Sequence, residues 1–182
     1  MPSPVGHMLA GVAVTWSILP QARTRVATVA AVLAAAPDLD LLLPVQHRTA
    51  THSIAAVALV VIVAAAVTRE VTPAWRARLA AVCGLAVASH LLLDWLGPDP
   101  VFPHGIRMFW PLSDRFFISG WDIFRPTART AIFSPAVMAH NLAAAAQELL
   151  LLGPLVWLLW FVRVKPAARF PAEVPGRHHP PK

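Results

Sequence analysis

The sequence predicts an all-α fold: an integral membrane bundle of about five short helices, with a long aromatic-rich loop before the last helix. Two observations lead to this prediction. Apolar residues (Ala, Val, Ile, Leu, Met, Phe, Trp, Tyr and Cys) make up 57% of the 182 residues, and only 13% are charged. A soluble domain averages about 45–50% apolar and about 25% charged residues. The apolar residues are also gathered into five separate stretches, which points to helices in lipid.

Each apolar stretch is taken as one helix. Crossing about 30 Å of hydrocarbon takes about 20 helical residues. The last two stretches reach this length, the third is slightly short, and the first two are clearly short. The five stretches are Met8–Leu19, Val26–Ala36, Ser53–Thr68, Leu79–Leu96 and Val137–Val162.

The first two stretches allow an alternative, a re-entrant hairpin that enters and leaves the bilayer on one side. Arg23 and Arg25 lie in the turn between them. In a re-entrant hairpin this turn would be the tip inside the bilayer, where each charge costs at least about 2.5–3.5 kcal/mol. We therefore expect five short, Ala-rich spans.

The basic residues are divided unequally between the two sides of this bundle. Ten of the fifteen Lys and Arg residues fall in the turns after the first and third spans and in the C-terminal tail. The excess of positive charge favours that side as cytoplasmic. The loop over residues 97–136 then faces outward. Residues 1–165 form the membrane-embedded domain, and the Pro-rich, polar segment 166–182 is predicted to be a disordered tail.

Ionisable residues lie near the outer ends of the predicted spans, although they played no part in the span assignment. Elements that are distant in sequence thus bring imidazoles and carboxylates to one level of the membrane, with Glu148 somewhat deeper. These residues are His7, Asp38, Asp40, His47, Arg48, His52, His90, Asp94 and Glu148.

His90 and Asp94 are four residues apart and share one helix face. An ionisable pair inside an apolar span marks a functional site, because burying it is costly. The structural alternative is a His–Asp hydrogen bond that locks two helices together. Asp38 and Asp40 follow Pro37 at the end of a helix, where a simple helix-ending turn is the alternative.

The segment from His47 to Ser53 leads into the third span. Thr51 or Ser53 can cap that helix, and the guanidinium of Arg48 suits a phosphate or carboxylate. The alternative is a cap with interfacial side chains. For Glu148, the alternative is a hydrogen bond between helices.

Taken together, these residues predict a metal site. Buried carboxylates without a cation would have raised pKa values and lose much of their ligand capacity. Mixtures of His and carboxylate suit Zn²⁺, with Mn²⁺ and Fe as alternatives. There are more ligands than one tetrahedral ion needs, so we expect one or two ions. The predicted ligands are His7, Asp38, Asp40, His47, His52, His90, Asp94 and Glu148.

The same residues carry a family resemblance. Gly6-His7, Pro37-Asp38-Leu39-Asp40, His47-Arg48-x-x-Thr51-His52-Ser53 and Ser89-His90-x-x-x-Asp94 occur in this order, and Trp110-Pro111 follows. Over roughly residues 3–162 the chain resembles the membrane-bound metal-dependent hydrolases, also described as LexA-binding, inner membrane-associated hydrolases. The resemblance implies a helical inner-membrane protein with metal-dependent hydrolase activity. Nothing in the sequence supports carrying over LexA binding.

A second resemblance is to the all-helical zinc-dependent phospholipase C and nuclease group. Asp38-x13-His52, then His90-x3-Asp94 and a late Glu148, are similar to the ligand order of that group. The sequence departs from the pattern at Ala144, where a His would precede the late Glu, and this counts against a third metal. The resemblance implies phosphoester chemistry.

We therefore expect a hydrolase in which metal-activated water attacks a phosphoester or ester, lipid-like substrates included. Asp40 or Asp94 would act as the base, and Arg48 would hold the substrate anion. The alternative is a membrane transporter or cation-binding protein that uses the same cluster, but the cytoplasmic halves of the later spans offer almost no charged residues for a path. The expected partners are membrane lipid and a small-molecule or lipid substrate, and no nucleic-acid motif is present.

Overall fold

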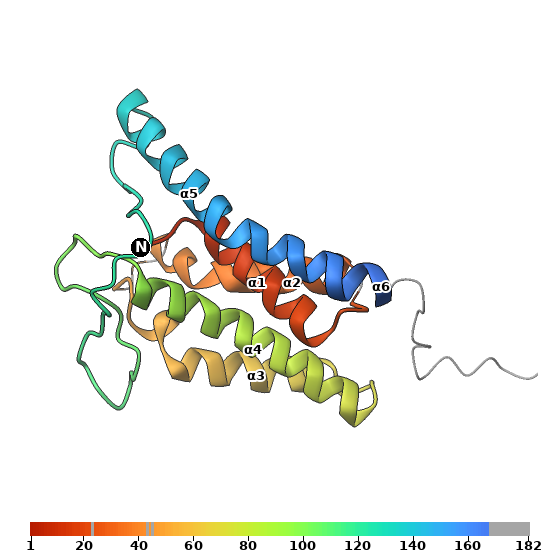
Figure 1. The fold of residues 1–182 in the computed structure, drawn as a ribbon. Helices are drawn as coiled ribbons and strands as arrows, with labels where there is room; N and C mark the ends of the chain where they lie inside the picture. Colours follow the sequence, from red (N-terminus) through yellow and green to blue (C-terminus); the bar gives the residue numbers. More distant parts are fainter. Residues whose placement is uncertain (23, 43, 45, 168–182) are drawn as a thin grey trace, which may run out of the picture.

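The computed structural model describes residues 1–22, 24–42, 44 and 46–167. Within these residues the chain is helical and forms no strand, which confirms the predicted all-α bundle (Figure 1). From residue 168 onward, the predicted tail lies outside the described residues. The main helices are α1 (Pro4–Ile18), α2 (Thr24–Ala35), α3 (Ile54–Val67), α4 (Pro73–Leu96) and α5 (Pro135–Leu159). The shorter ones are η1 (Ala36–Leu42), η2 (Ala50–His52), η3 (Trp160–Val164) and α6 (Lys165–Ala167).

Serine caps fix the starts of three helices. The side chains of Ser3, Ser53 and Ser134 accept hydrogen bonds from backbone N–H groups in the first turns of α1, α3 and α5. Such a side chain satisfies one of the N–H groups that a helix start leaves without a partner. Of the two cap candidates that the sequence offered for the third span, the structure uses Ser53.

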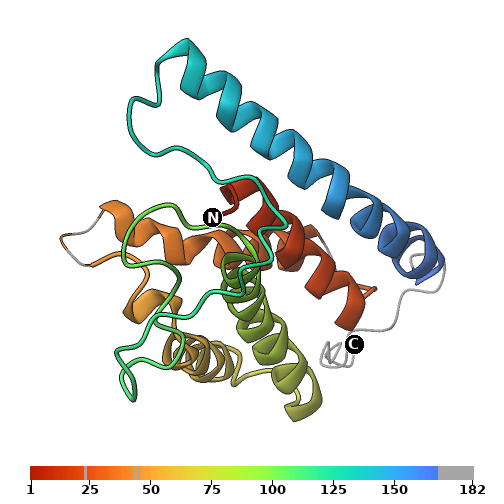
Figure 2. The same cartoon turned by 60° about the vertical axis from the view of Figure 1, so that its left-hand side comes forward.

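Helix α1 lies at the centre of the bundle. It packs against α2, α4 and α5, while α3 packs against α4 (Figures 1 and 2). Small side chains such as Ala30, Ala34 and Ala86 are fully buried at these contacts. They let the helix backbones approach closely, as small residues do between helices in membranes.

Gly11 marks the closest approach of α1 and α2. A Cβ atom built there would lie 2.5 Å from the Ala30 carbonyl oxygen and 2.9 Å from the Cα atom of Ala31. Because both are backbone atoms, Gly11→Ala must push the helices apart, and we expect it to cost about 1–3 kcal/mol. Thermal unfolding in detergent measures this cost. Gly153→Ala is the control, since nothing lies within 4 Å of its Cβ position; equal melting temperatures for the two variants would contradict the packing.

Two helices expose apolar surface along their length. No residue of α3 is buried, and only Ala144 and Glu148 are buried in α5. Ile62 on α3 is 65% exposed and Leu150 on α5 is 77% exposed. A large continuous apolar surface of this kind is rare in a soluble monomer and suits contact with lipid.

Helix length separates the predicted spans into two groups. Pro73–Leu96, with 24 residues, and Pro135–Ala167, with 33, are long and apolar enough to cross a membrane. Pro4–Ile18 and Ile54–Val67 are apolar but shorter, with 15 and 14 residues. Helix α2 is shorter still, with 12 residues. Length and composition therefore identify two candidate spans, and the full count of five remains a proposal.

The predicted long loop joins α4 to α5 and crosses the end of the bundle where α1 begins and α4 ends (Figure 1). Ile106 and Phe124 are buried and anchor it. Other aromatic side chains point outward: Phe102 is 83% exposed and Trp121 is 70% exposed. The loop thus combines a packed inner side with an aromatic outer side.

Candidate metal centre

Four elements deliver ionisable side chains to the loop-covered end of the bundle. Here α1 contributes one imidazole, η1 two carboxylates, the segment before α3 two imidazoles, and α4 an imidazole and a carboxylate. Seven of the eight predicted ligands thus come together. They are His7, Asp38, Asp40, His47, His52, His90 and Asp94.

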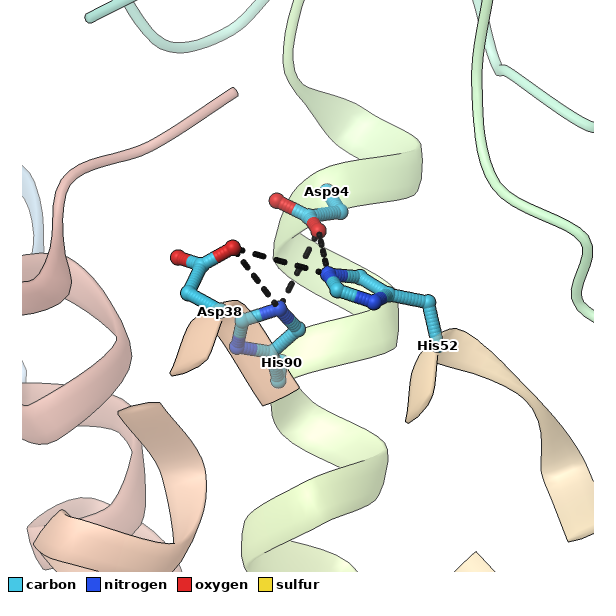
Figure 3. A group of neighbouring side chains, drawn as sticks. All are labelled: Asp38, His52, His90 and Asp94. Carbon is cyan, nitrogen blue, oxygen red and sulfur yellow. Dashed lines mark ion pairs between the residues drawn. The ribbon is translucent and has the colours of Figure 1, made fainter. Parts of the chain in front are cut away.

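The inner part of the cluster consists of Asp38, His52, His90 and Asp94 (Figure 3). The Nε2 atom of His90 lies 3.2 Å from Asp94 Oδ2, and that of His52 lies 3.5 Å from the same oxygen. Asp38 Oδ1 lies 3.5 Å from His52 Nε2 and 3.8 Å from His90 Nε2. Ligands bound tetrahedrally to one Zn²⁺ at about 2.0–2.1 Å lie about 3.3–3.4 Å apart. The spacing fits a shared ion.

The atoms that converge here have no hydrogen-bond partner among the described residues. They are buried, and leaving a buried polar atom unpaired costs about 1–3 kcal/mol, more where the group is charged. A single cation would satisfy several of them at once. The unpartnered atoms of the cluster are His7 Nδ1 and Nε2, Asp38 Oδ1, His47 Nε2, His52 Nε2, His90 Nε2, and Asp94 Oδ1 and Oδ2.

Contacts on the far side of the His90 and His52 rings leave their Nε2 atoms free. His90 Nδ1 lies 2.7 Å from the Ala34 carbonyl oxygen, which can only accept, so Nδ1 carries the proton. His52 Nδ1 lies 2.9 Å from Thr51 Oγ1 and 3.4 Å from Asp40 Oδ2. Metal-binding histidines are typically held this way, with one nitrogen on a carbonyl or carboxylate and the other on the ion.

Asp40, predicted as a ligand and base, lies behind the histidines instead. Its Oδ1 is 2.5 Å from His47 Nδ1, and its Oδ2 accepts a hydrogen bond of 2.6 Å from Thr51 Oγ1. Asp40, His47 and His52 do form a compact group. However, the direct contact between Asp40 and His47 leaves no room for an ion between those two atoms. Burial would raise the pKa of Asp40, but the hydrogen bonds from His47, His52 and Thr51 hold it well below its usual range.

Asp40→Asn should therefore weaken metal binding without abolishing it. The Asn amide has one accepting oxygen, so it cannot face the rings of both His47 and His52 with an acceptor, as the Asp40 carboxylate does. Loss of such a supporting group costs about 10–100-fold in metal affinity. Calorimetric titration of the ion-free protein with Zn²⁺ measures the change. Asp114→Asn is the matched control, since the Asp114 side chain is 83% exposed. An unchanged Zn²⁺ affinity in Asp40→Asn would contradict a role for Asp40 in orienting the histidines.

The raised pKa of His52 would make metal binding at this cluster pH-dependent. Burial alone would lower this pKa, but the facing carboxylates of Asp38 and Asp40 raise it to about 9. In the ion-free protein, the charged ring stabilises the fold fully below its ordinary pKa of about 6.5, and this contribution is lost as the pH rises through about 9. Imidazole binds metal only when neutral, so binding releases a proton. Apparent Zn²⁺ affinity should therefore rise with pH up to about 9 in a competition titration; a flat profile would contradict this.

Glu148, the eighth predicted ligand, does not join the cluster. Its buried carboxylate accepts hydrogen bonds from Ser3 N at 2.6 Å, from Gly6 N at 2.9 Å and from Ser3 Oγ. The N–H groups and positive dipole at the start of α1 attract the carboxylate. A Cβ atom on Gly6 would lie 2.8 Å from Glu148 Oε2, so a larger residue there would displace this carboxylate. Glu148 thus binds the start of α1, the helix that carries His7.

Arg48, predicted to hold the substrate anion, is paired within the protein. Its guanidinium forms a buried ion pair with Asp99 and donates a hydrogen bond of 3.2 Å to the Val101 carbonyl oxygen. Asp99 Oδ2 also accepts from Gly105 N at 2.7 Å. Arg48 therefore ties the long loop to the cluster. Sequence reasoning missed Asp99, for which the available signal was a carboxylate three residues beyond the end of an apolar helix.

Comparison with curated proteins and with solved structures finds no match. The family described as YdjM inner membrane protein matches residues 1–168. The match includes every element that contributes to the cluster, and it agrees with the apolar outer surface of α3 and α5. It confirms the inner-membrane part of the predicted resemblance. The chain belongs to the YdjM inner membrane protein family.

Proposed function

We propose that this protein is a multi-pass inner-membrane hydrolase that depends on one or two divalent transition-metal ions, with Zn²⁺ preferred over Mn²⁺ or Fe. The observation that carries the proposal is the convergence of unpartnered imidazole and carboxylate atoms from four elements distant in sequence. Such clusters are costly unless they bind a cation. Ionisable groups inside an apolar bundle mark functional sites.

The residues divide into ligands and proton carriers. A bound cation would lower the pKa of a water molecule and polarise a phosphoryl or acyl oxygen. His47 lies at the accessible edge of the cluster, where its side chain is 14% exposed and that of Asp38 is 17% exposed. With Nδ1 held by Asp40, the free Nε2 of His47 is positioned to accept a proton from water. Asp40 would then act through His47, while Asp94 serves as a ligand.

The surroundings of the centre favour a phosphoester or ester with a lipid-like body. The exposed aromatic residues of the loop, including Phe102 and Trp121, lie on the same end of the bundle as the centre. Aromatic side chains favour the membrane–water interface. A substrate that resides in the bilayer would meet the centre at this level.

The charge distribution favours an extracytoplasmic centre. The end of the bundle opposite the cluster carries most of the basic residues that flank helices, and the positive side of an inner-membrane protein faces the cytoplasm. Those within the described residues are Arg25, Arg69, Arg76, Arg78, Arg163 and Lys165.

The same cluster would serve a transporter only if a polar path continued through the bundle. The described helix α3 contains no ionisable side chain, and the groups of the cluster gather at one end. A conducting path needs polar or charged groups at successive depths. This arrangement favours hydrolysis over transport.

Metal-dependent turnover tests the proposal. The protein is purified in detergent, stripped with a chelator and reloaded with Zn²⁺ or Mn²⁺. We expect hydrolysis of bis(p-nitrophenyl) phosphate or of a p-nitrophenyl ester that disappears on stripping and returns on reloading. A reloaded protein that binds metal, hydrolyses neither substrate and carries the ion across proteoliposomes would establish the transporter instead.

A further inference from the structure

Asp38 and Asp94 each turn their two oxygens toward different imidazoles. Asp38 Oδ1 and Asp94 Oδ2 face His52 and His90, at distances of 3.2–3.8 Å. The other oxygens face His7: Asp94 Oδ1 lies 3.5 Å from His7 Nε2, and Asp38 Oδ2 lies 4.0 Å from it. The two carboxylates therefore lie between the imidazoles of His52 and His90 on one side and the imidazole of His7 on the other.

We propose, building on the metal-dependent function above, that the centre holds two ions bridged by Asp38 and Asp94. The first ion lies among Asp38 Oδ1, His52, His90 and Asp94 Oδ2. The second is held by His7, Asp38 Oδ2 and Asp94 Oδ1. In two-metal sites the ions are about 3.5–4 Å apart, a separation that a carboxylate with one oxygen on each ion can span.

The surroundings of His7 provide a separate argument for the second ion. Its side chain is 0% exposed, and neither ring nitrogen has a hydrogen-bond partner in the part of the chain that the structure describes. The ring stacks on that of His90, with centroids 3.8 Å apart and planes inclined by 21°. An ion of its own would give Nε2 the partner that it lacks.

The two sets differ in the number of ligands that they supply. The first has four, which completes a tetrahedral site of the structural kind. The second has three, and catalytic zinc sites typically combine three protein ligands with an open position. The second set also includes the outer oxygen of Asp38, the more exposed of the two carboxylates. The geometry therefore assigns the substrate-facing ion to His7.

Metal stoichiometry and magnetic coupling test this inference without relying on turnover. The ion-free wild-type protein is titrated with Mn²⁺, bound metal is counted by elemental analysis, and electron paramagnetic resonance reports whether ions are coupled. The variants are His7→Ala and His7→Phe, the second of which preserves an aromatic ring against His90. His140→Ala is the control, because that exposed ring hydrogen-bonds to the Pro126 carbonyl oxygen, away from the cluster.

We expect two ions per chain and a coupled spectrum in the wild type and in His140→Ala. Each His7 variant should bind one ion and give the spectrum of isolated Mn²⁺. One ion in the wild type, or two in His7→Phe, would overturn the two-ion inference and leave the metal-dependent function standing. No bound ion in any form would overturn both.

Discussion

Replacing Asp94 with Ala is expected to lower Zn²⁺ affinity by more than about 100-fold and to remove metal-dependent turnover. Loss of a group that merely supports a ligand costs about 10–100-fold, and Asp94 is in direct contact with the inner imidazoles. Its side chain is 0% exposed, and among the described residues neither oxygen has a hydrogen-bond partner, so both are available to a cation. Calorimetric titration and the p-nitrophenyl assays measure the two effects.

Two controls separate this effect from misfolding. Asp94→Asn preserves the shape of the side chain but removes its charge, and we expect it to weaken binding as well. Asp114→Asn removes an exposed carboxylate and should behave as the wild type. Wild-type metal content and turnover in a folded Asp94→Ala protein would show that the cluster is not the metal centre.

The second large effect concerns the link between the loop and the centre. Arg48→Ala is expected to destabilise the protein by about 3–5 kcal/mol, because it leaves the Asp99 carboxylate charged, buried and unpaired. The side chains of this pair are 7% and 4% exposed. Arg107→Ala removes a comparable ion pair with the exposed Asp114, and an exposed pair contributes only about 0–1 kcal/mol.

Unfolding by heat or denaturant in detergent compares the two Arg variants. The double variant Arg48→Met with Asp99→Leu should recover much of the lost stability, since replacing both charges with apolar side chains leaves no unpaired charge. Equal destabilisation by Arg48→Ala and Arg107→Ala would contradict a buried, structural role for the Arg48–Asp99 pair.

Local patterns were sufficient to predict much of the fold and of the cluster. The apolar stretches located the main helices to within six residues at each end, most closely at α3, where Ser53–Thr68 was predicted and Ile54–Val67 is found. His90 and Asp94 share a helix face because of their spacing, and that pairing is present. Their side chains and those of the segments before α3 meet because all lie at the same end of the bundle.

The roles that sequence reasoning misjudged depend on contacts between distant segments. Glu148 has the depth and chemistry of a ligand, but the N–H groups of Ser3 and Gly6 compete for its carboxylate. Arg48 suits an anion, and the anion that it meets is Asp99, carried by the loop. The periodicity of one helix does not show which group from another segment forms the hydrogen bond or ion pair with a given side chain.

The metal content of the purified protein tests the central claim most directly. Protein extracted in mild detergent is analysed for transition metals, and X-ray absorption at the edge of the metal found reports its ligands. We expect at least one ion per chain, bound by nitrogen and oxygen atoms at about 2.0–2.2 Å. A chain that retains no transition metal, and takes up none after incubation with Zn²⁺, Mn²⁺ or Fe²⁺, would contradict the account.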